Sequence, residues 1–276
     1  MTRIFGALIL IVVLAVPAVF GPSWVLALLA AIVVPVCMFE LFRAALSPSA
    51  RALGWVSMAA SVPFMYFAYR ADAASCFFIL GVASVALMIG SLFLFEKGLA
   101  TAKDLVYSIA GLIYPMALIG FWVLLRVGVD GRFWMIFGLV CVFGADSGAY
   151  YVGKNLGRHR LAPRLSPKKT WEGFAGGICA AVLLGYAVYR IYDAVTSTWH
   201  VDPLTGTYPL WLLAVLAASI GVLDLAGDLT ASLFKRDLQI KDMGNLIPGH
   251  GGMLDRLDGI IPVGCLLYCI LLVAMR

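Results

Sequence analysis

The chain has 276 residues and a net charge of +5, and 63% of its residues are hydrophobic while only 13% are charged. A soluble domain carries about 45–50% apolar and about 25% charged residues, so too few polar side chains are present to cover a water-facing surface. Disordered, coiled-coil and collagen-like chains are excluded as well, because the apolar residues are neither sparse nor periodic in sevens or threes. Since the basic residues lie in short loops between apolar runs, the charge does not indicate a nucleic-acid partner.

Apolar runs long enough to cross a bilayer recur along the whole chain, because a spanning helix needs about 20 such residues. The sequence therefore predicts an all-α, polytopic integral membrane protein with about nine transmembrane helices. They are centred on residues 4–20, 24–42, 53–69, 74–95, 105–125, 133–152, 174–192, 210–233 and 260–275. The first run resembles a signal peptide, but further spans follow at once, so we expect it to remain as an uncleaved helix.

The basic residues predict the orientation of these spans. Fifteen of the 20 lysines and arginines fall on the side that holds the N-terminus. By the positive-inside rule that side is cytoplasmic, and the C-terminus lies outside. Residues 1–100 are expected to be a scaffold of N-terminal helices. Residues 101–200 carry the basic loop 154–170, and residues 201–276 carry the catalytic helices and a signature loop, 227–258.

Three carboxylates, Asp146, Asp224 and Asp228, fall within predicted spans. Each charge costs about 2.5–3.5 kcal/mol at the centre of a membrane helix, so such residues indicate a functional site. Asp224 and Asp228 are four residues apart and share one helix face, where they repel each other. A bound cation would remove this repulsion. The alternatives are a helix end in water or pairing with a nearby arginine.

The segment 232–258 joins acids and cations at the membrane edge. It holds Lys235, Arg236, Lys241 and Arg256, the acids Asp237, Asp242, Asp255 and Asp258, and His250 among three glycines. If the end of this segment is helical, Asp255 and Asp258 share a face. Carboxylates with lysine and arginine between them suit a hard cation that holds phosphate oxygens. A solvated loop that only sets the topology would not need the glycines or the acids.

A second basic stretch runs from Ser166 to Gly173. Ser166 followed by Pro167 is a favourable start for a helix. Lys168 and Lys169 in its first turn would oppose the helix dipole unless an anion lies there. We therefore predict that Ser166, Lys168 and Lys169 contact phosphate, with plain membrane anchoring as the alternative. Together the two stretches predict a cytoplasm-facing polar cavity, but they identify neither a nucleotide nor a lipid.

Other polar features carry no prediction of chemistry. Residues 148–155 nearly match a phosphate-binding loop but follow a membrane helix and lack the serine or threonine that ligates Mg²⁺. The six cysteines show no metal-binding or disulfide spacing and are read as buried apolar residues. His159 and His200 are lone loop histidines with no assigned role.

The segment from Gly227 to Asp258 closely resembles the signature of bacterial phosphatidate cytidylyltransferases (CDP-diacylglycerol synthases). The matching residues are Gly227, Asp228, Leu229, Ser232, Lys235, Arg236, Lys241, Asp242, Leu246 to Gly252, Leu254, Asp255, Arg256 and Asp258. Residues 146–150 and 166–170 look like further elements of that family in the same order, so the resemblance covers roughly residues 140–262.

The resemblance implies an enzyme that converts CTP and phosphatidic acid into CDP-diacylglycerol and pyrophosphate with Mg²⁺, as a multi-pass homodimer of the bacterial inner membrane. It implies that Asp228 and Asp255 ligate the metal, and it leaves open a second cation with Asp224, Asp146 or Asp258 as ligands. The other site residues that it implies are Lys235, Arg236, Lys241, Asp242, His250, Arg256 and Asp258. Ala231 replaces a common glutamate, and Gly259 replaces a usual serine.

Three other functions remain open. A CTP-dependent kinase of polyprenol-type lipids would also bring a nucleotide and a lipid to one membrane site, but it would release CDP in place of pyrophosphate. In a transporter the intramembrane acids would couple to ions, yet the acids cluster at one edge and no inverted repeat is present. The third alternative is an inactive paralogue, because Ala231 and Gly259 depart from the residue pattern of the family.

Overall fold

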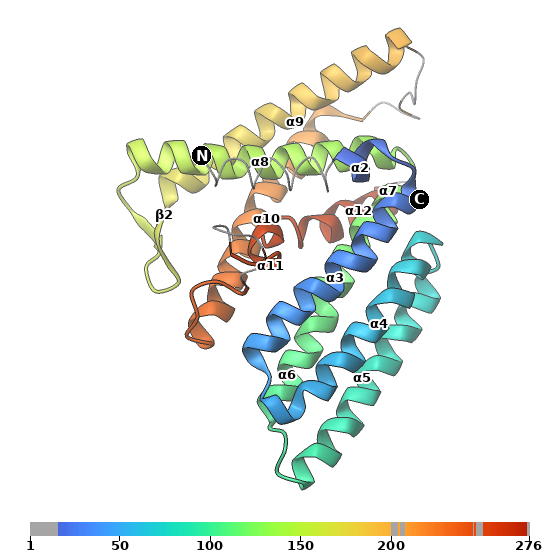
Figure 1. Cartoon of the computed structure of the whole chain (residues 1–276). Helices are drawn as coiled ribbons and strands as arrows, with labels where there is room; N and C mark the ends of the chain where they lie inside the picture. Colours follow the sequence, from blue (N-terminus) through green and yellow to red (C-terminus); the bar gives the residue numbers. More distant parts are fainter. Residues whose placement is uncertain (1–15, 200–203, 205–207, 245, 247–250, 275–276) are drawn as a thin grey trace. The chain divides into compact units, whose positions relative to one another are not determined.

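The computed structural model describes residues 16–199, 204, 208–244, 246 and 251–274 (Figure 1). The chain forms two compact units. The first comprises Met1–Val127 with Asp237–Leu257, and the second comprises Gly128–Arg236 with Asp258–Arg276. Both units draw on the C-terminal part of the chain, so the signature segment 227–258 is divided between them.

The first unit is a helical bundle whose helices α3, α4, α5 and α6 lie side by side (Figure 1). Its elements are α2 (Val16–Phe20), α3 (Ser23–Ala45), η2 (Pro48–Ala50), α4 (Arg51–Tyr69), α5 (Ala73–Glu96), α6 (Ala102–Gly111), η3 (Leu112–Ala117), α7 (Leu118–Val127) and α11 (Leu254–Leu257). Helices α6, η3 and α7 are continuous and form a single span, Ala102–Val127. The π-helical turn η3 surrounds Pro115, whose missing N–H breaks the regular hydrogen-bond ladder.

The second unit consists of long helices and one small hairpin. Its elements are α8 (Gly131–Leu156), β1 (Arg160–Ala162), β2 (Ser166–Thr170), α9 (Trp171–Trp199), α10 (Leu210–Asp237, of which Asp237 belongs to the first unit) and α12 (Val263–Ala274). The two strands pair antiparallel, with Arg160 opposite Thr170 and Ala162 opposite Ser166.

Seven helical segments in the described part of the chain are long and apolar enough to cross a membrane. They coincide with seven of the predicted spans, which confirms an all-α polytopic membrane protein. The predicted ninth span corresponds to α12, a shorter apolar helix that begins directly after Pro262. Most of the predicted first span lies outside the described residues, so the total of nine stays a prediction.

The segment 166–170 corrects one prediction from sequence. Ser166 and Pro167 do not begin a helix, because residues 166–170 pair with β1 as an extended strand. The helix begins at Trp171, and its cap is Thr170, whose Oγ1 accepts a hydrogen bond from Gly173 N at 3.2 Å. Threonine is a favoured cap because its oxygen satisfies an orphan N–H of the first turn. Lys168 and Lys169 therefore lie on a strand, and the helix-dipole argument for an anion does not apply to them.

A buried carboxylate that the sequence analysis did not single out fixes the turn before α6. Asp104 is 2% exposed, and its Oδ2 accepts hydrogen bonds from Thr101 N at 2.8 Å and Thr101 Oγ1 at 2.7 Å. Its Oδ1 accepts another from Ser47 N at 2.8 Å. This capping box joins the start of α6 to the end of α3, which explains why an acid is retained among apolar helices.

Helices α8 and α9 share the most extensive helix–helix contact of the second unit, and small residues make it possible. Gly148 of α8 lies so close to Gly176 and Ala180 of α9 that an added Cβ would overlap them. An added Cβ at Gly177 would likewise meet the backbone of α8 at Ala145. Small residues at such a seam let helix backbones approach closely, which is how membrane helices gain packing energy in the absence of water.

This seam predicts a contrast between two identical substitutions. We expect Gly148→Ala to lower the free energy of unfolding by about 1–3 kcal/mol, because the added methyl group overpacks the α8–α9 contact. Gly81→Ala is the matched control, since nothing lies within 4 Å of a Cβ at Gly81. It should stay within about 0.5 kcal/mol of the parent. Thermal denaturation in detergent micelles measures both, and equal stabilities would contradict the close packing.

Candidate functional site

A cavity of about 660 Å³ lies within the second unit, between α8, the hairpin, the start of α9 and the middle of α10. Acidic and basic side chains from these elements share it with apolar ones. Its lining comprises Ala145, Asp146, Ala149, Tyr150, Gly153, Lys154, Arg160, Ser166, Lys168, Lys169, Thr170, Gly173, Phe174, Gly177, Gly221, Asp224, Leu225 and Asp228. The cavity therefore contains all three intramembrane carboxylates and all three phosphate-contact residues predicted from the sequence.

The three carboxylates interact with one ammonium group. Lys169 Nζ of β2 lies 2.5 Å from Asp228 Oδ2 of α10. Lys169 also interacts electrostatically with Asp146 of α8 and with Asp224 of α10. Asp224 is only 6% exposed, so an unmatched charge there would be costly. The bound cation that the sequence suggests for Asp224 and Asp228 stays a prediction, whereas the described structure pairs Asp228 with a lysine of β2.

The segment that follows Asp258 approaches α10 closely. A Cβ at Gly259 would overlap the carboxylate of Asp224, and a Cβ at Gly227 would overlap the carbonyl of Asp258. Asp258 also interacts electrostatically with Asp224. This geometry gives a physical reason for one departure from the family pattern, because a serine in place of Gly259 would require Asp224 to move.

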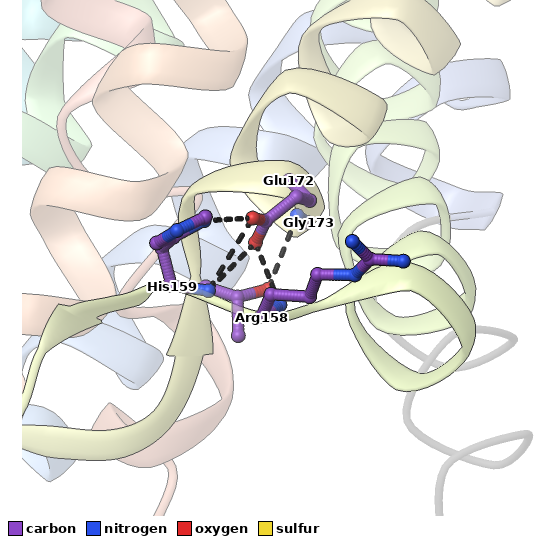
Figure 2. A network of polar contacts seen from close by, with 5 residues as sticks. Arg158, His159, Glu172 and Gly173 are labelled. Atoms are coloured by element: carbon purple, nitrogen blue, oxygen red, sulfur yellow. Dashed lines mark hydrogen bonds and ion pairs between the residues drawn. The ribbon is translucent and has the colours of Figure 1, made fainter.

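The hairpin that carries Lys168 and Lys169 is tied to the first turn of α9 through Glu172 (Figure 2). Glu172 Oε2 accepts a hydrogen bond from Arg158 N at 3.1 Å, and His159 N lies 3.2 Å from the same oxygen. His159 Nδ1 lies 2.6 Å from Glu172 Oε1. His159, to which the sequence analysis gave no role, thus contacts the residue that orients the hairpin. The sequence did contain a signal for this contact, because Glu172 is an acid in the first turn of a helix and follows a basic loop.

Further contacts hold the turn of the hairpin. The guanidinium group of Arg160 donates a hydrogen bond to the carbonyl of Pro167, across the hairpin. Arg236, at the end of α10, donates from Nε to the carbonyl of Leu165 at 3.4 Å. Two arginines therefore bind backbone carbonyls on either side of Ser166. The predicted site residue Arg236 lies at this turn, whereas Lys235 lies beside it in the last turn of α10.

The first unit holds the other predicted site residues, Lys241, Asp242, Asp255 and Arg256. Asp255 Oδ2 accepts hydrogen bonds from Met243 N at 2.8 Å and from Gly252 N at 3.1 Å, so this carboxylate closes its own loop. Gly251, next to Asp242 and Asp255, has a φ of +81°, a conformation that favours glycine. His250 lies outside the described residues.

A second carboxylate that the sequence analysis did not single out meets this loop. Glu40 lies inside α3 and accepts hydrogen bonds from Met253 N and Leu254 N, each at 2.9 Å. The one signal for Glu40 in the sequence was that it is an acid within an otherwise apolar span.

The carboxylate oxygens that line the cavity are ligands of the kind that Mg²⁺ prefers. Within the described ranges, no group of three or more His, Cys, Asp and Glu side chains is arranged to hold a metal by itself. Mg²⁺ is usually bound by one or two carboxylates together with substrate phosphates, so a complete protein cage is not required. Asp228, with Asp146 and Asp224 beside it, supplies hard oxygen ligands next to lysines that would bind phosphate. The predicted ligands Asp228 and Asp255 belong to different units, and their joint role stays a prediction.

Comparison with known proteins places the chain in a family. A model described as "Cytidylyltransferase family" matches residues 1–274. The chain is similar to a phosphatidate cytidylyltransferase of Synechocystis sp., with 37% identity over 63% of the chain and 64% of the relative. It also resembles a protein of the same name from Bacillus subtilis, with 40% identity over 51% of the chain and 48% of the relative. A third relative of this name, from Mycobacterium bovis, has 41% identity over 48% of the chain and 39% of the relative. The aligned part thus spans less than two thirds of the length of these relatives.

The role of Glu172 is testable by proteolysis. Glu172→Ala removes the contacts of the Glu172 carboxylate with Arg158 and His159 that Figure 2 shows, so trypsin cleavage at Arg158, Arg160 and Arg164 should become about tenfold faster as the hairpin opens. His159→Ala removes only the side-chain contact and leaves both backbone N–H donors, so its cleavage rate should stay within about twofold of the parent. Mass spectrometry of the early fragments measures both rates. Equal rates in the two variants would show that Glu172 does not hold the hairpin.

Proposed function

Because the chain belongs to the cytidylyltransferase family, we propose that it transfers the cytidylyl group of CTP to phosphatidic acid, giving CDP-diacylglycerol and pyrophosphate. The observation that carries the proposal is the cavity of the second unit, where Lys169 pairs with Asp228 and interacts electrostatically with Asp146 and Asp224. This combination of hard oxygen ligands and lysines suits a metal-bound triphosphate. The names of the similar proteins support the same substrates.

The cavity has the size and lining that such substrates need. Its volume of about 660 Å³ falls within the range of about 300–1,000 Å³ that is usual for small-molecule sites. Lys154, Lys168 and Arg160 add positive charge, whereas Phe174 and Leu225 line it with apolar surface. A lipid phosphate whose acyl chains remain among membrane helices and a charged nucleotide could therefore meet at one place.

The chemistry requires positioning and charge neutralisation more than proton transfer. A phosphate oxygen of phosphatidic acid attacks the α-phosphorus of CTP, a new P–O bond forms, and the bond to the β-phosphate oxygen breaks to release pyrophosphate. The nucleophile is already anionic near neutral pH, so no general base is needed. The main barrier is the repulsion between two anionic phosphates, which Lys168, Lys169 and Arg160 would reduce by direct contact with phosphate oxygens.

Asp228 and Asp255 are the residues that would hold Mg²⁺, with Asp224 or Asp146 as additional ligands. The ion supplies positive charge that neutralises the triphosphate and the leaving pyrophosphate. Lys169 pairs with Asp228. Phosphate oxygens would offer Lys169 a second partner, so its charge would both offset the acids of the cavity and bind substrate.

The proposal extends to the cellular setting. The protein would work as a homodimer in the bacterial inner membrane, with its N-terminus in the cytoplasm, its C-terminus outside and its cavity facing the cytoplasm, where CTP is available. The excess of basic residues on one side of the predicted spans supports this orientation. The resemblance to the family supports the dimer.

The central test is pyrophosphate release by purified protein in mixed micelles that contain CTP, phosphatidic acid and Mg²⁺. We expect release to require all three, and Asp228→Asn and Asp255→Asn each to lower kcat by about 1,000-fold, because each loses a metal ligand. Asp193→Asn is the matched control, since Asp193 is an exposed acid of α9 that does not line the cavity. Release of CDP without pyrophosphate would instead establish a kinase. Activity that survives both ligand variants would refute the metal assignment.

Two adjacent lysines provide a second test. Lys169→Met removes the cation that pairs with Asp228, so kcat/KM for CTP should fall about 100-fold, equal to about 2.7 kcal/mol. Lys168→Met removes a more exposed cation that has no such pair in the described structure, and a loss of about tenfold is expected. Steady-state kinetics with CTP as the varied substrate separates the two. A Lys169→Met enzyme as active as Lys168→Met would contradict the arrangement proposed for the site.

A further inference from the structure

Glu40 is an acid within α3 that the reaction proposed above does not use. It is 5% exposed and lies in a span of otherwise apolar character, between Phe39 and Leu41. A carboxylate in such a position is costly unless specific partners replace water. Its retention therefore indicates a definite set of contacts.

Those contacts are with the loop that carries Asp255 and Arg256. Glu40 Oε1 accepts a hydrogen bond from Met253 N, and Oε2 accepts one from Leu254 N, both at 2.9 Å. These two N–H groups stand at the beginning of α11 and have no partner within that helix. Each oxygen of Glu40 thus binds one backbone donor of a segment more than 200 residues later in the chain.

The loop is also shaped around this carboxylate. A Cβ at Gly244 would overlap Glu40, and so would a Cβ at Gly252. Leu254, the next residue but one, is fully buried. The two glycines therefore allow the loop backbone to lie directly against the acid, which a residue with a side chain would prevent.

The contacts of Glu40 bear on the position of Asp255. Asp255 Oδ2 binds Met243 N and Gly252 N, and so links the two ends of its loop. Glu40 binds the two residues between Gly252 and Asp255. The carboxylate of Asp255 is thus held by a closed loop, and Glu40 is the attachment of that loop to α3.

We propose that Glu40 is a positioning residue of the transferase, which fixes the loop backbone at Met253 and Leu254 and thereby sets the placement of Asp255 and Arg256. This inference rests on the proposed function, because it assigns catalytic value to the position of those two side chains. Glu40 itself contacts neither substrate nor metal. Its effect on the reaction passes through the loop.

The test combines two variants with a matched control. Glu40→Gln keeps the size of the side chain, but its amide nitrogen cannot accept a hydrogen bond from a backbone N–H. Gly244→Ala leaves Glu40 intact and displaces its carboxylate with a methyl group. Asp104→Asn is the control, because Asp104 is another buried acid of the first unit that binds backbone N–H groups, but of the turn before α6.

Two readouts are measured on the full-length protein in micelles: amide hydrogen exchange of the peptide 251–257, and kcat for pyrophosphate release. We expect Glu40→Gln and Gly244→Ala each to speed exchange at Met253 and Leu254 about tenfold and to lower kcat about tenfold. Asp104→Asn should reduce thermal stability yet leave both quantities within about twofold of the parent. A loss of stability alone would not reproduce this pattern.

Each contrary result is decisive. Unchanged exchange in Glu40→Gln would show that Glu40 does not hold the loop. Faster exchange with an unchanged kcat would show that the contact is structural only. A fall in kcat of the same size in Asp104→Asn would assign the effect to general destabilisation. If the parent protein releases no pyrophosphate, the proposed function fails, whereas the exchange data still decide whether Glu40 anchors the loop.

Discussion

The cost of a carboxylate among apolar helices governs the polar architecture of this protein. Insertion into hydrocarbon costs a few kcal/mol per charge, so each intramembrane acid needs a partner that replaces water. Asp228 has the ammonium group of Lys169, whereas Asp104 and Glu40 have backbone N–H groups of turns and loops. These partners come from non-helical segments, and the acids therefore determine where the hairpin and the loops are attached to the helices of their own unit.

Close packing of small residues complements these polar attachments. Gly148, Gly176 and Gly177 let α8 and α9 approach at the level of their backbones. The short hairpin connects these two helices, and Glu172 at the start of α9 binds the backbone of Arg158 and His159, directly before its first strand. A seam of glycines and a single glutamate thus place Lys169 opposite the acids of α8 and α10. The candidate site consequently depends on packing that contains no catalytic residue.

Sequence patterns predicted the helices better than their polar connections. Seven spans were located because long apolar runs have few other stable structures in a membrane. The prediction that a helix begins at Ser166-Pro167 was wrong, since pairing with residues 160–162 stabilises an extended strand. The helix begins later, and Thr170 supplies its cap. Glu40 was passed over because a single acid in an apolar run has no local partner, and its two donors lie at the other end of the chain.

The sequence by itself determined the membrane class, most of the spans, and the three acids and two of the lysines, Lys168 and Lys169, that line the cavity. It did so because hydrophobicity, charge and local spacing are properties of neighbouring residues. Only the tertiary structure decided which acid meets which cation, that Lys168 and Lys169 lie on a strand, and that Glu40 binds the loop of Asp255. These pairings join residues far apart in the chain, and they depend on how helices pack and on which distant donors can reach a buried carboxylate.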